Sequence, residues 1–138
     1  MNKKPQFLQF DKIGSSNLGY ISVAENFENI PFEVQRVYWT YFTPQDVTRG
    51  GHAHFALEQV IVAVSGKIVF STEDLAGNKE EFILDSPDKG LYIPQKIWRD
   101  IKFSHNAVLL CLASEKYTED DYMRNYETFL EYRKDNKI

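Results

Sequence analysis

Residues 57–84 read LEQVIVAVSGKIVFSTEDLAGNKEEFIL and give the strongest indication of the fold. The run 57–64 is apolar and rich in β-branched residues, and a Ser-Gly pair ends it, which is typical of a buried strand. Residues 67–72 and 80–84 are two further strand-like runs, joined through a turn that contains Gly77-Asn78. A Gly-Asn pair between two such runs predicts a β-hairpin.

Short strand-like segments continue on both sides of this stretch, separated by turn residues and without intervening helical patterns. They are Phe7–Phe10, Tyr20–Ala24, Glu33–Phe42, Leu91–Ile93, Trp98–Phe103 and Ala107–Ser114, with a loop over Pro44–Gly51. Many short strands at even spacing predict an antiparallel sandwich or barrel. Because the chain has 138 residues and no internal repeat, we expect one domain over residues 1–138.

The C-terminal tail changes from a strand pattern to a helical one. Thr118-Glu119-Asp120-Asp121 has a hydroxyl residue followed three positions later by a carboxylate, which resembles a capping box at the start of a helix. Tyr122, Tyr126, Phe129 and Leu130 then recur at helical spacing. We therefore predict an all-β barrel with a C-terminal α-helix packed on it.

Charge and composition exclude several classes of function. Lys and Arg number 16 against 20 Asp and Glu, a net charge of −4 without a basic block, so we expect no nucleic-acid binding. No apolar run approaches the ~20 residues of a membrane span, and no signal peptide follows Met1. The only cysteine, Cys111, lies in an apolar run and is expected to pack in the core. These features predict a cytoplasmic protein.

Two of the three histidines lie in the segment Arg49-Gly50-Gly51-His52-Ala53-His54. On an extended segment, side chains two residues apart point to the same side, so both imidazoles share one face. Glu58 follows four residues after His54. This pattern resembles the first motif of the cupins, whose residues bind a metal inside a jelly-roll barrel. Spacing alone leaves the pair balanced between metal ligands and proton-transfer groups.

A later position argues against a metal. In metal-binding cupins a proline is followed five residues on by a further histidine ligand, whereas the matching stretch here, Pro94–Arg99, ends in an arginine. A guanidinium has no lone pair to offer a cation, and its permanent charge opposes a divalent ion. The third histidine, His105, lies in a turn and is expected to face solvent. We predict no metal and no cofactor, since a Gly-rich dinucleotide fingerprint is also missing from the sequence.

Over nearly its whole length, from about Phe10 to Leu130, the chain resembles the sugar 3,4-ketoisomerases of the WxcM-like cupin family, which act on dTDP-4-keto-6-deoxyglucose. The matching stretches are Ile30–Phe32, Arg36–Tyr38, Arg49–His54, Leu57–Gln59, Leu84–Pro87, Gly90–Pro94, Ile97–Arg99, Leu112–Tyr117 and Asp121–Tyr126. One departure is Leu18, which stands where relatives often carry an arginine before the glycine. The resemblance therefore assigns no active-site contacts to the loop Ser16–Gly19 around Leu18, and it does not assign the stereochemistry at C4 of the product.

The resemblance implies a metal-independent isomerase on a jelly-roll barrel, the double-stranded β-helix of the cupins. It also implies a homodimer whose first strands are exchanged between subunits. It assigns the catalytic base to His52 and its partner to His54, and it places Tyr38 and Arg36 on the lining of the sugar and phosphate pocket. The implied substrate is a dTDP-linked keto sugar. Its product would lead to dTDP-3-amino-3,6-dideoxy sugars of surface polysaccharides such as the lipopolysaccharide O-antigen.

The residues fit this chemistry independently. Moving a ketone from C4 to C3 requires a group of near-neutral pKa to remove the C3 proton, and histidine is the usual choice. His54, Tyr38 or water can relay a second proton between the two oxygens, and Tyr38 or an arginine can stabilise the enediolate. The predicted catalytic residues are thus His52, His54 and Tyr38. The predicted substrate-binding residues are Arg36, Arg49, Gly51, Gln59, Trp98 and Arg99.

These binding residues have different predicted roles. Arg36 and Arg49 are candidates for the diphosphate, since a guanidinium pairs with phosphate on two donors. Gly51 lets the backbone approach a ligand closely. Trp98 is a candidate for stacking on thymine.

Three alternatives stay open. A metal-dependent cupin oxygenase would use His52, His54 and Glu58. A dTDP-sugar 3,5-epimerase would exchange protons at C3 and C5 without moving the ketone. A non-catalytic sugar-binding cupin would bind the nucleotide sugar without proton exchange at any carbon.

Overall fold

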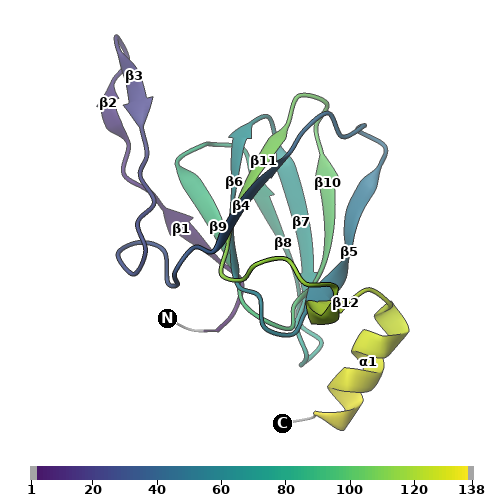
Figure 1. The fold of residues 1–138 in the computed structure, drawn as a ribbon. Helices are drawn as coiled ribbons and strands as arrows, with labels where there is room; N and C mark the ends of the chain where they lie inside the picture. The colour runs from purple at the N-terminus through teal and green to yellow at the C-terminus, as the bar shows by residue number, and fades with distance from the viewer. Residues whose placement is uncertain (1–2, 137–138) are drawn as a thin grey trace.

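The computed structural model describes residues 3–136 and shows two five-stranded antiparallel sheets that face each other (Figure 1). The first sheet contains, in spatial order, β1 (Gln6–Gln9), β9 (Lys89–Ile93), β6 (Gln59–Ser65), β11 (Val108–Ala113) and β4 (Arg36–Thr40). The second contains β12 (Tyr122–Met123), β5 (Thr48–His54), β10 (Trp98–Phe103), β7 (Ile68–Glu73) and β8 (Lys79–Leu84). Consecutive strands such as β5 and β6 lie in opposite sheets, so the predicted all-β jelly-roll barrel is confirmed.

The core lies between the two sheets because side chains alternate along each strand. In β11, Leu109, Cys111 and Ala113 are buried and face the opposite sheet, and the two leucines between them are only partly covered. Cys111 is a buried free thiol, so its predicted place in the core is confirmed. No helix among the described residues is long and apolar enough to cross a membrane.

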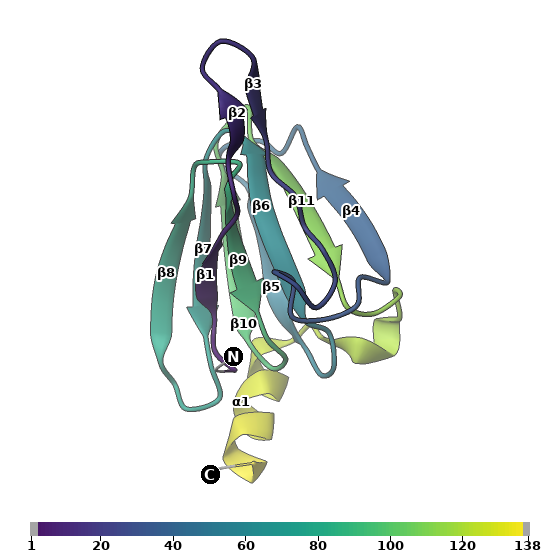
Figure 2. The same ribbon diagram turned by 90° about the vertical axis from the view of Figure 1, so that its left-hand side faces the viewer.

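A separate hairpin extends from the barrel near the N-terminus. Strands β2 (Ile13–Ser15) and β3 (Gly19–Ile21) pair with each other and project away from both sheets in Figures 1 and 2. Every residue of these two strands is exposed, and Leu18 between them is 90% exposed. From the sequence we expect a loop over Gly14–Asn17 and a strand over Tyr20–Ala24 here, because short exposed strands lack the apolar alternation that marks a core strand.

The predicted start of the C-terminal helix is wrong. Thr118 makes no side-chain cap bond, and it precedes a 3-10 turn at Glu119–Asp121 and then strand β12. Pairing of β12 with β5 diverts the chain before a helix can form. Helix α1 spans Tyr126–Asp135, and the side chain of Asn125 accepts hydrogen bonds from the first-turn N–H groups. The helix packs against the barrel through Phe129, as predicted for the tail.

Candidate active site

His52 and His54 lie on strand β5, which begins at Thr48, so the last four residues of the loop predicted over Pro44–Gly51 belong to this strand. His52 and His54 alternate with Ala53 along the strand and point to the same side, as predicted. The strand runs close to β10 at Gly50, where a Cβ atom would lie 2.8 Å from the carbonyl oxygen of Arg99. Gly50 also has a φ of 85°, which favours glycine. The glycine therefore allows β5 to approach β10 directly before the first histidine.

His52 lines an open cavity of about 380 Å³ at the edge of the barrel. Its Nδ1 lies 3.2 Å from the carbonyl oxygen of Gly50. A carbonyl oxygen only accepts hydrogen bonds, so Nδ1 of a neutral His52 carries the proton and Nε2 keeps its lone pair. The other residues that line the cavity are Arg36, Tyr38, Arg49, Gly50, Tyr122 and Arg124.

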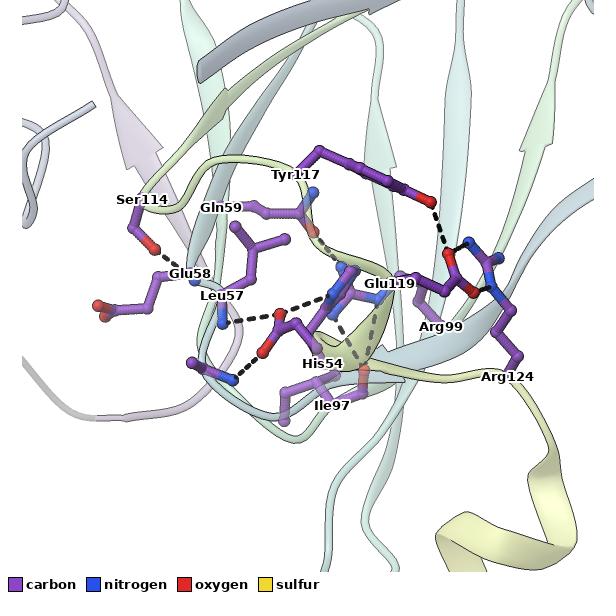
Figure 3. Close-up of polar contacts among 12 residues, drawn as sticks. His54, Leu57, Glu58, Gln59, Ile97, Arg99, Ser114, Tyr117, Glu119 and Arg124 are labelled. Carbon is purple, nitrogen blue, oxygen red and sulfur yellow. Dashed lines mark hydrogen bonds and ion pairs between the residues drawn. The ribbon is translucent and has the colours of Figure 1, made fainter. Parts of the chain in front are cut away.

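His54 lies behind His52 and is only 1% exposed. The two imidazole rings meet edge to face, with 4.8 Å between their centroids. Nδ1 of His54 donates to Oδ2 of Asp121 at 3.1 Å, a contact drawn beside Arg99 in Figure 3. His54 is not among the residues that line the cavity, so it reaches a bound ligand only through its neighbours.

Both histidines are neutral at pH 7. Removal from water, followed by the nearby charge of Arg99, lowers the pKa of His52 to about 4. The same two causes lower the pKa of His54 to about 2. The site therefore holds two uncharged imidazoles beside guanidinium groups, so both are free to accept a proton at neutral pH. In the structure without a ligand, His52 is a weaker base than the near-neutral group expected from the sequence.

A buried polar network connects the two sheets behind the cavity. Arg99 is 1% exposed and donates to Gln59 and, at 3.0 Å from Nη2, to the carbonyl oxygen of Ile97 (Figure 3). Nε2 of Gln59 lies 3.0 Å from the hydroxyl of Tyr38 and 3.2 Å from Sγ of Cys111. Burial lowers the pKa of Arg99 to about 10, so this arginine stays charged at neutral pH.

Tyr38 joins this network to the cavity. The residue as a whole is 36% exposed, while its hydroxyl points inward to Gln59. Burial of the hydroxyl, followed by its contact with Cys111, raises the pKa of Tyr38 well above its ordinary value. Tyr38 therefore stays protonated, and because its hydroxyl oxygen accepts from Gln59, it keeps a proton that it can donate.

Positive charge surrounds the mouth of the cavity. Arg36, Arg49 and Arg124 all line it. Nε of Arg36 is buried without a hydrogen-bond partner among the described residues, and its guanidinium lies 5.4 Å from the ring of Tyr38. Arg124 pairs with Glu119 at 3.0 Å. Three guanidinium groups around one cavity suit a ligand with several phosphate oxygens.

Three residues of the site were not predicted from the sequence. Tyr122 and Arg124 line the cavity, and Asp121 holds His54. All three lie in the tail, which its spacing had assigned to a helix. Pairing of β12 with β5 brings them to the histidines, and this pairing is a long-range contact that local spacing does not reveal.

Trp98, predicted as a residue that stacks on thymine, does not line this cavity. Neighbouring residues on a strand point to opposite faces, so Trp98 faces outward where Arg99 faces inward. Its ring packs against Tyr126 and Phe129 of helix α1, with centroid distances of 5.2 and 5.7 Å. It lines a different hollow of about 410 Å³ on the outer face of the second sheet.

The metal triad of the oxygenase alternative is not assembled. Glu58 accepts hydrogen bonds from Tyr92 and from Lys3, the latter at 3.0 Å, so its carboxylate is bound away from the histidines. No group of three or more His, Cys, Asp or Glu side chains within residues 3–136 is placed to hold a metal ion. The donor set around His52 and His54 therefore does not fit the predicted metal alternative.

A jelly-roll barrel with two neutral histidines beside an arginine-lined cavity defines a cupin-type enzyme. Residues 3–134 match the family described as WxcM-like, C-terminal (FdtA), and the chain belongs to this family. The predicted family is thereby confirmed, and the relatives described next confirm the predicted enzyme class, the sugar 3,4-ketoisomerases.

Relatives of known activity match almost the whole chain. A TDP-4-oxo-6-deoxy-α-D-glucose-3,4-oxoisomerase from Aneurinibacillus thermoaerophilus is 40% identical over 127 residues, covering 91% of this chain and 89% of the relative. The structure of WlaRB, a TDP-quinovose 3,4-ketoisomerase from Campylobacter jejuni, is 40% identical, covers 94% of this chain and 99% of that one, and has a TM-score of 0.88.

A third relative was solved with a keto sugar. The 3,4-ketoisomerase QdtA from Thermoanaerobacterium thermosaccharolyticum, as a histidine-to-asparagine variant in complex with TDP-4-keto-6-deoxyglucose, is 32% identical with a TM-score of 0.92. The match covers 100% of this chain and 99% of that one.

Proposed function

We propose that this chain moves the keto group of dTDP-4-keto-6-deoxyglucose from C4 to C3, with His52 as the base that acts on carbon. The observation that carries the proposal is the position of His52. It lines the arginine-rich cavity, its Nε2 has a lone pair, and burial keeps it neutral. The activities of the 40% identical relatives support the same reaction.

The reaction follows from this geometry. The C4 carbonyl acidifies the C3 proton, and Nε2 of His52 takes that proton while the C3–H electron pair forms the enediolate double bond between C3 and C4. The protonated His52 then returns a proton to C4. A second proton leaves the C3 oxygen and reaches the C4 oxygen, so the ketone has moved without any net oxidation. No redox cofactor is needed for this balance.

Tyr38 and His54 have different parts in this account. Tyr38 stays protonated at the cavity wall, so we assign it to the oxygens, where it donates to the enediolate and relays the second proton. His54 is enclosed, so we assign it to the support of His52. Gln59 and Arg99 are covered as well, and we propose that they act on the sugar through the hydroxyl of Tyr38.

The nucleotide binds at the charged rim. We assign Arg36, Arg49 and Arg124 to the diphosphate, because each lines the cavity. Gly51 has a positive φ of 67°, and a Cβ there would meet only Asp100 at 3.9 Å, so its backbone is open to a ligand. This assignment keeps the predicted roles of Arg36, Arg49 and Gly51.

We further propose a homodimer in which N-terminal strands are exchanged. Strand β1 pairs with β9 of its own chain, so the β2–β3 hairpin is the part of the N-terminal segment that is placed to reach a partner. The hairpin carries exposed Ile13 and Ile21, and the outer face of β4 exposes Val37 and Trp39. Contact between two such apolar surfaces would remove both from water.

The proposed product is a 3-keto sugar nucleotide. An aminotransferase would convert it to a dTDP-3-amino-3,6-dideoxy sugar for surface polysaccharide. We place this reaction in the cytoplasm, where the free thiol of Cys111 stays reduced.

Incubation of the protein with dTDP-4-keto-6-deoxyglucose in deuterated water, with EDTA present, tests the proposal by product NMR. We expect a 3-keto product with deuterium at C4. Deuterium at C3 and C5 with the ketone still at C4 would indicate the 3,5-epimerase alternative. Binding without exchange at any carbon would indicate a sugar-binding protein, and activity lost on chelation would indicate a metal enzyme.

A further inference from the structure

Among the acidic residues within residues 3–136, Asp121 is the one that hydrogen-bonds to a member of the histidine pair, His54. Its Oδ2 lies 3.1 Å from Nδ1 of His54. Its Oδ1 accepts from the N–H of Ala56 at 2.7 Å, and Oδ2 also accepts from the N–H of Leu57 at 3.3 Å. The carboxylate is therefore held at both oxygens by the turn that follows His54 on strand β5.

The backbone fixes Asp121 in the same place. Its carbonyl oxygen accepts from the N–H of Phe55 at 3.0 Å, and the next residue, Tyr122, pairs with His54 across β12 and β5. The rings of Tyr122 and His54 also lie against each other, with centroids 4.4 Å apart. The backbone of Asp121 is therefore fixed beside β5, and its carboxylate can leave the imidazole only by giving up the hydrogen bonds from Ala56 and Leu57.

This contact determines which nitrogen of His54 carries the proton. An ionised carboxylate only accepts hydrogen bonds, so Nδ1 of His54 must donate, and a neutral ring then has its lone pair on Nε2. We infer that Asp121 is a positioning residue that keeps His54 in the Nδ1–H form and holds its ring against that of His52. The carbonyl oxygen of Gly50 sets the same form in His52.

The consequence for the reaction rests on the proposed function, in which His52 takes a proton from carbon. His52 then becomes positive in a site where the charge of Arg99 opposes protonation. The carbonyl oxygen of Gly50 favours that charge. In the inferred arrangement the Nε2 lone pair of His54, with the negative charge of Asp121 behind it, adds to this stabilisation. If His54 carried its proton on Nε2, the positive end of an N–H bond would replace the lone pair.

The variant Asp121→Asn tests this inference because an amide has the shape of the carboxylate. Its oxygen can keep the shorter backbone bond, from Ala56, while its NH₂ group takes the place of Oδ2 and gives up the longer bond from Leu57. In that orientation the NH₂ group donates to Nδ1 of His54, which moves the proton to Nε2. The matched control is Asp120→Asn, which removes the same charge from the exposed neighbouring position. ¹⁵N NMR of the imidazole nitrogens identifies the form of His54 in each protein.

We expect the Nδ1–H form in the wild type and in Asp120→Asn, and the Nε2–H form in Asp121→Asn. In the proposed reaction kcat of Asp121→Asn should fall roughly 10²-fold, the low end of the effect of a positioned proton-transfer group, with KM unchanged. An Nε2–H form in the wild type overturns the inference even if the variant does not fold. A switched form with wild-type kcat overturns the catalytic role.

The NMR result does not depend on turnover. If the wild type failed to isomerise the sugar, the proposed function would fail, and the spectrum would still show whether Asp121 positions His54.

Discussion

Arg99 and His52 are direct partners in the register between β10 and β5, which places a buried guanidinium next to the imidazole that lines the cavity. In a metal-binding cupin the corresponding positions would carry ligands. Here the arginine opposes a cation and also opposes protonation of His52, whose pKa falls to about 4 through burial and then through Arg99. With Arg99 beside it, the His52–His54 motif, which resembles a metal-binding motif of the cupins, holds a neutral imidazole that can accept a proton.

Replacing Arg99 by methionine should raise the pKa of His52. Burial is the larger cause of the lowered value, so we expect the pKa to rise but to stay below the ordinary 6.5. The acid limb of the pH profile of kcat/KM should shift to higher pH by the same amount, because that limb reports the pKa of the base in the free enzyme. NMR titration of His52 measures the shift directly. Lys102→Met on the same strand is the control, and an unchanged His52 in Arg99→Met would refute the electrostatic role.

Stability should decrease as the pH is lowered from about 6.5. Both histidines have a lower pKa in the folded chain, about 4 for His52 and about 2 for His54, than the ordinary 6.5. Below pH 6.5 the unfolded chain therefore binds protons that the folded chain does not, and the free energy of unfolding falls. The slope is at most about 1.4 kcal/mol per pH unit for each histidine.

Urea unfolding at pH 7, 6 and 5 measures this slope. The variant His54→Asn should flatten it, whereas His105→Asn, at an exposed turn, should leave it as in the wild type. Equal slopes in all three proteins would show that the buried histidines are not the cause.

Gly50→Ala should destabilise the chain more than Gly77→Ala does. Both glycines have a positive φ, 85° and 90°, so both substitutions carry backbone strain of about 1–2 kcal/mol. Only at Gly50 does the new Cβ meet backbone, the carbonyl oxygen of Arg99 at 2.8 Å; at Gly77 it meets the flexible end of Arg133 at 3.8 Å. Gly50→Ala should also lower kcat, since the Gly50 carbonyl orients His52.

Urea midpoints and kcat of the two glycine variants provide the comparison. Equal losses of stability in both would mean that the close approach of β5 to β10 has no structural role.

Trp98→Ala should reduce stability and leave catalysis unchanged. Trp98 is 8% exposed and packs against helix α1, and truncation of such a side chain costs about 3–5 kcal/mol. The site lies on the other face of the strand, so kcat and the affinity for TDP, measured on folded protein, should equal those of the wild type. A loss of TDP affinity without a loss of stability would instead support the predicted stacking of Trp98 on thymine.

The sequence predicted the barrel and the histidine pair because both depend on local patterns. Alternation and turn residues identified most core strands, and the spacing of His52 and His54 placed both on one face. The same alternation excludes a shared role for Trp98 and Arg99, which are neighbours on one strand. What local patterns could not reveal was the contact of Asp121 with His54, which depends on the pairing of a two-residue strand far along the chain.

The arginines at the mouth of the cavity were likewise predicted only in part, because local patterns do not reveal long-range strand pairing. The resemblance to the ketoisomerases implied that Arg36 and Tyr38 line the pocket, and both line the cavity. Arg124 was not predicted, because its segment has helical spacing in the sequence but follows a strand in the structure.

The substitution His52→Asn tests the central claim most directly, with the exchange of solvent deuterium into C4 of dTDP-4-keto-6-deoxyglucose as the measurement. We expect turnover to fall by at least about 10²-fold, because the base at carbon is lost, while the affinity for TDP stays as in the wild type. His105→Asn should behave as the wild type. A His52→Asn protein with full exchange and full turnover would contradict the assignment of His52 as the base.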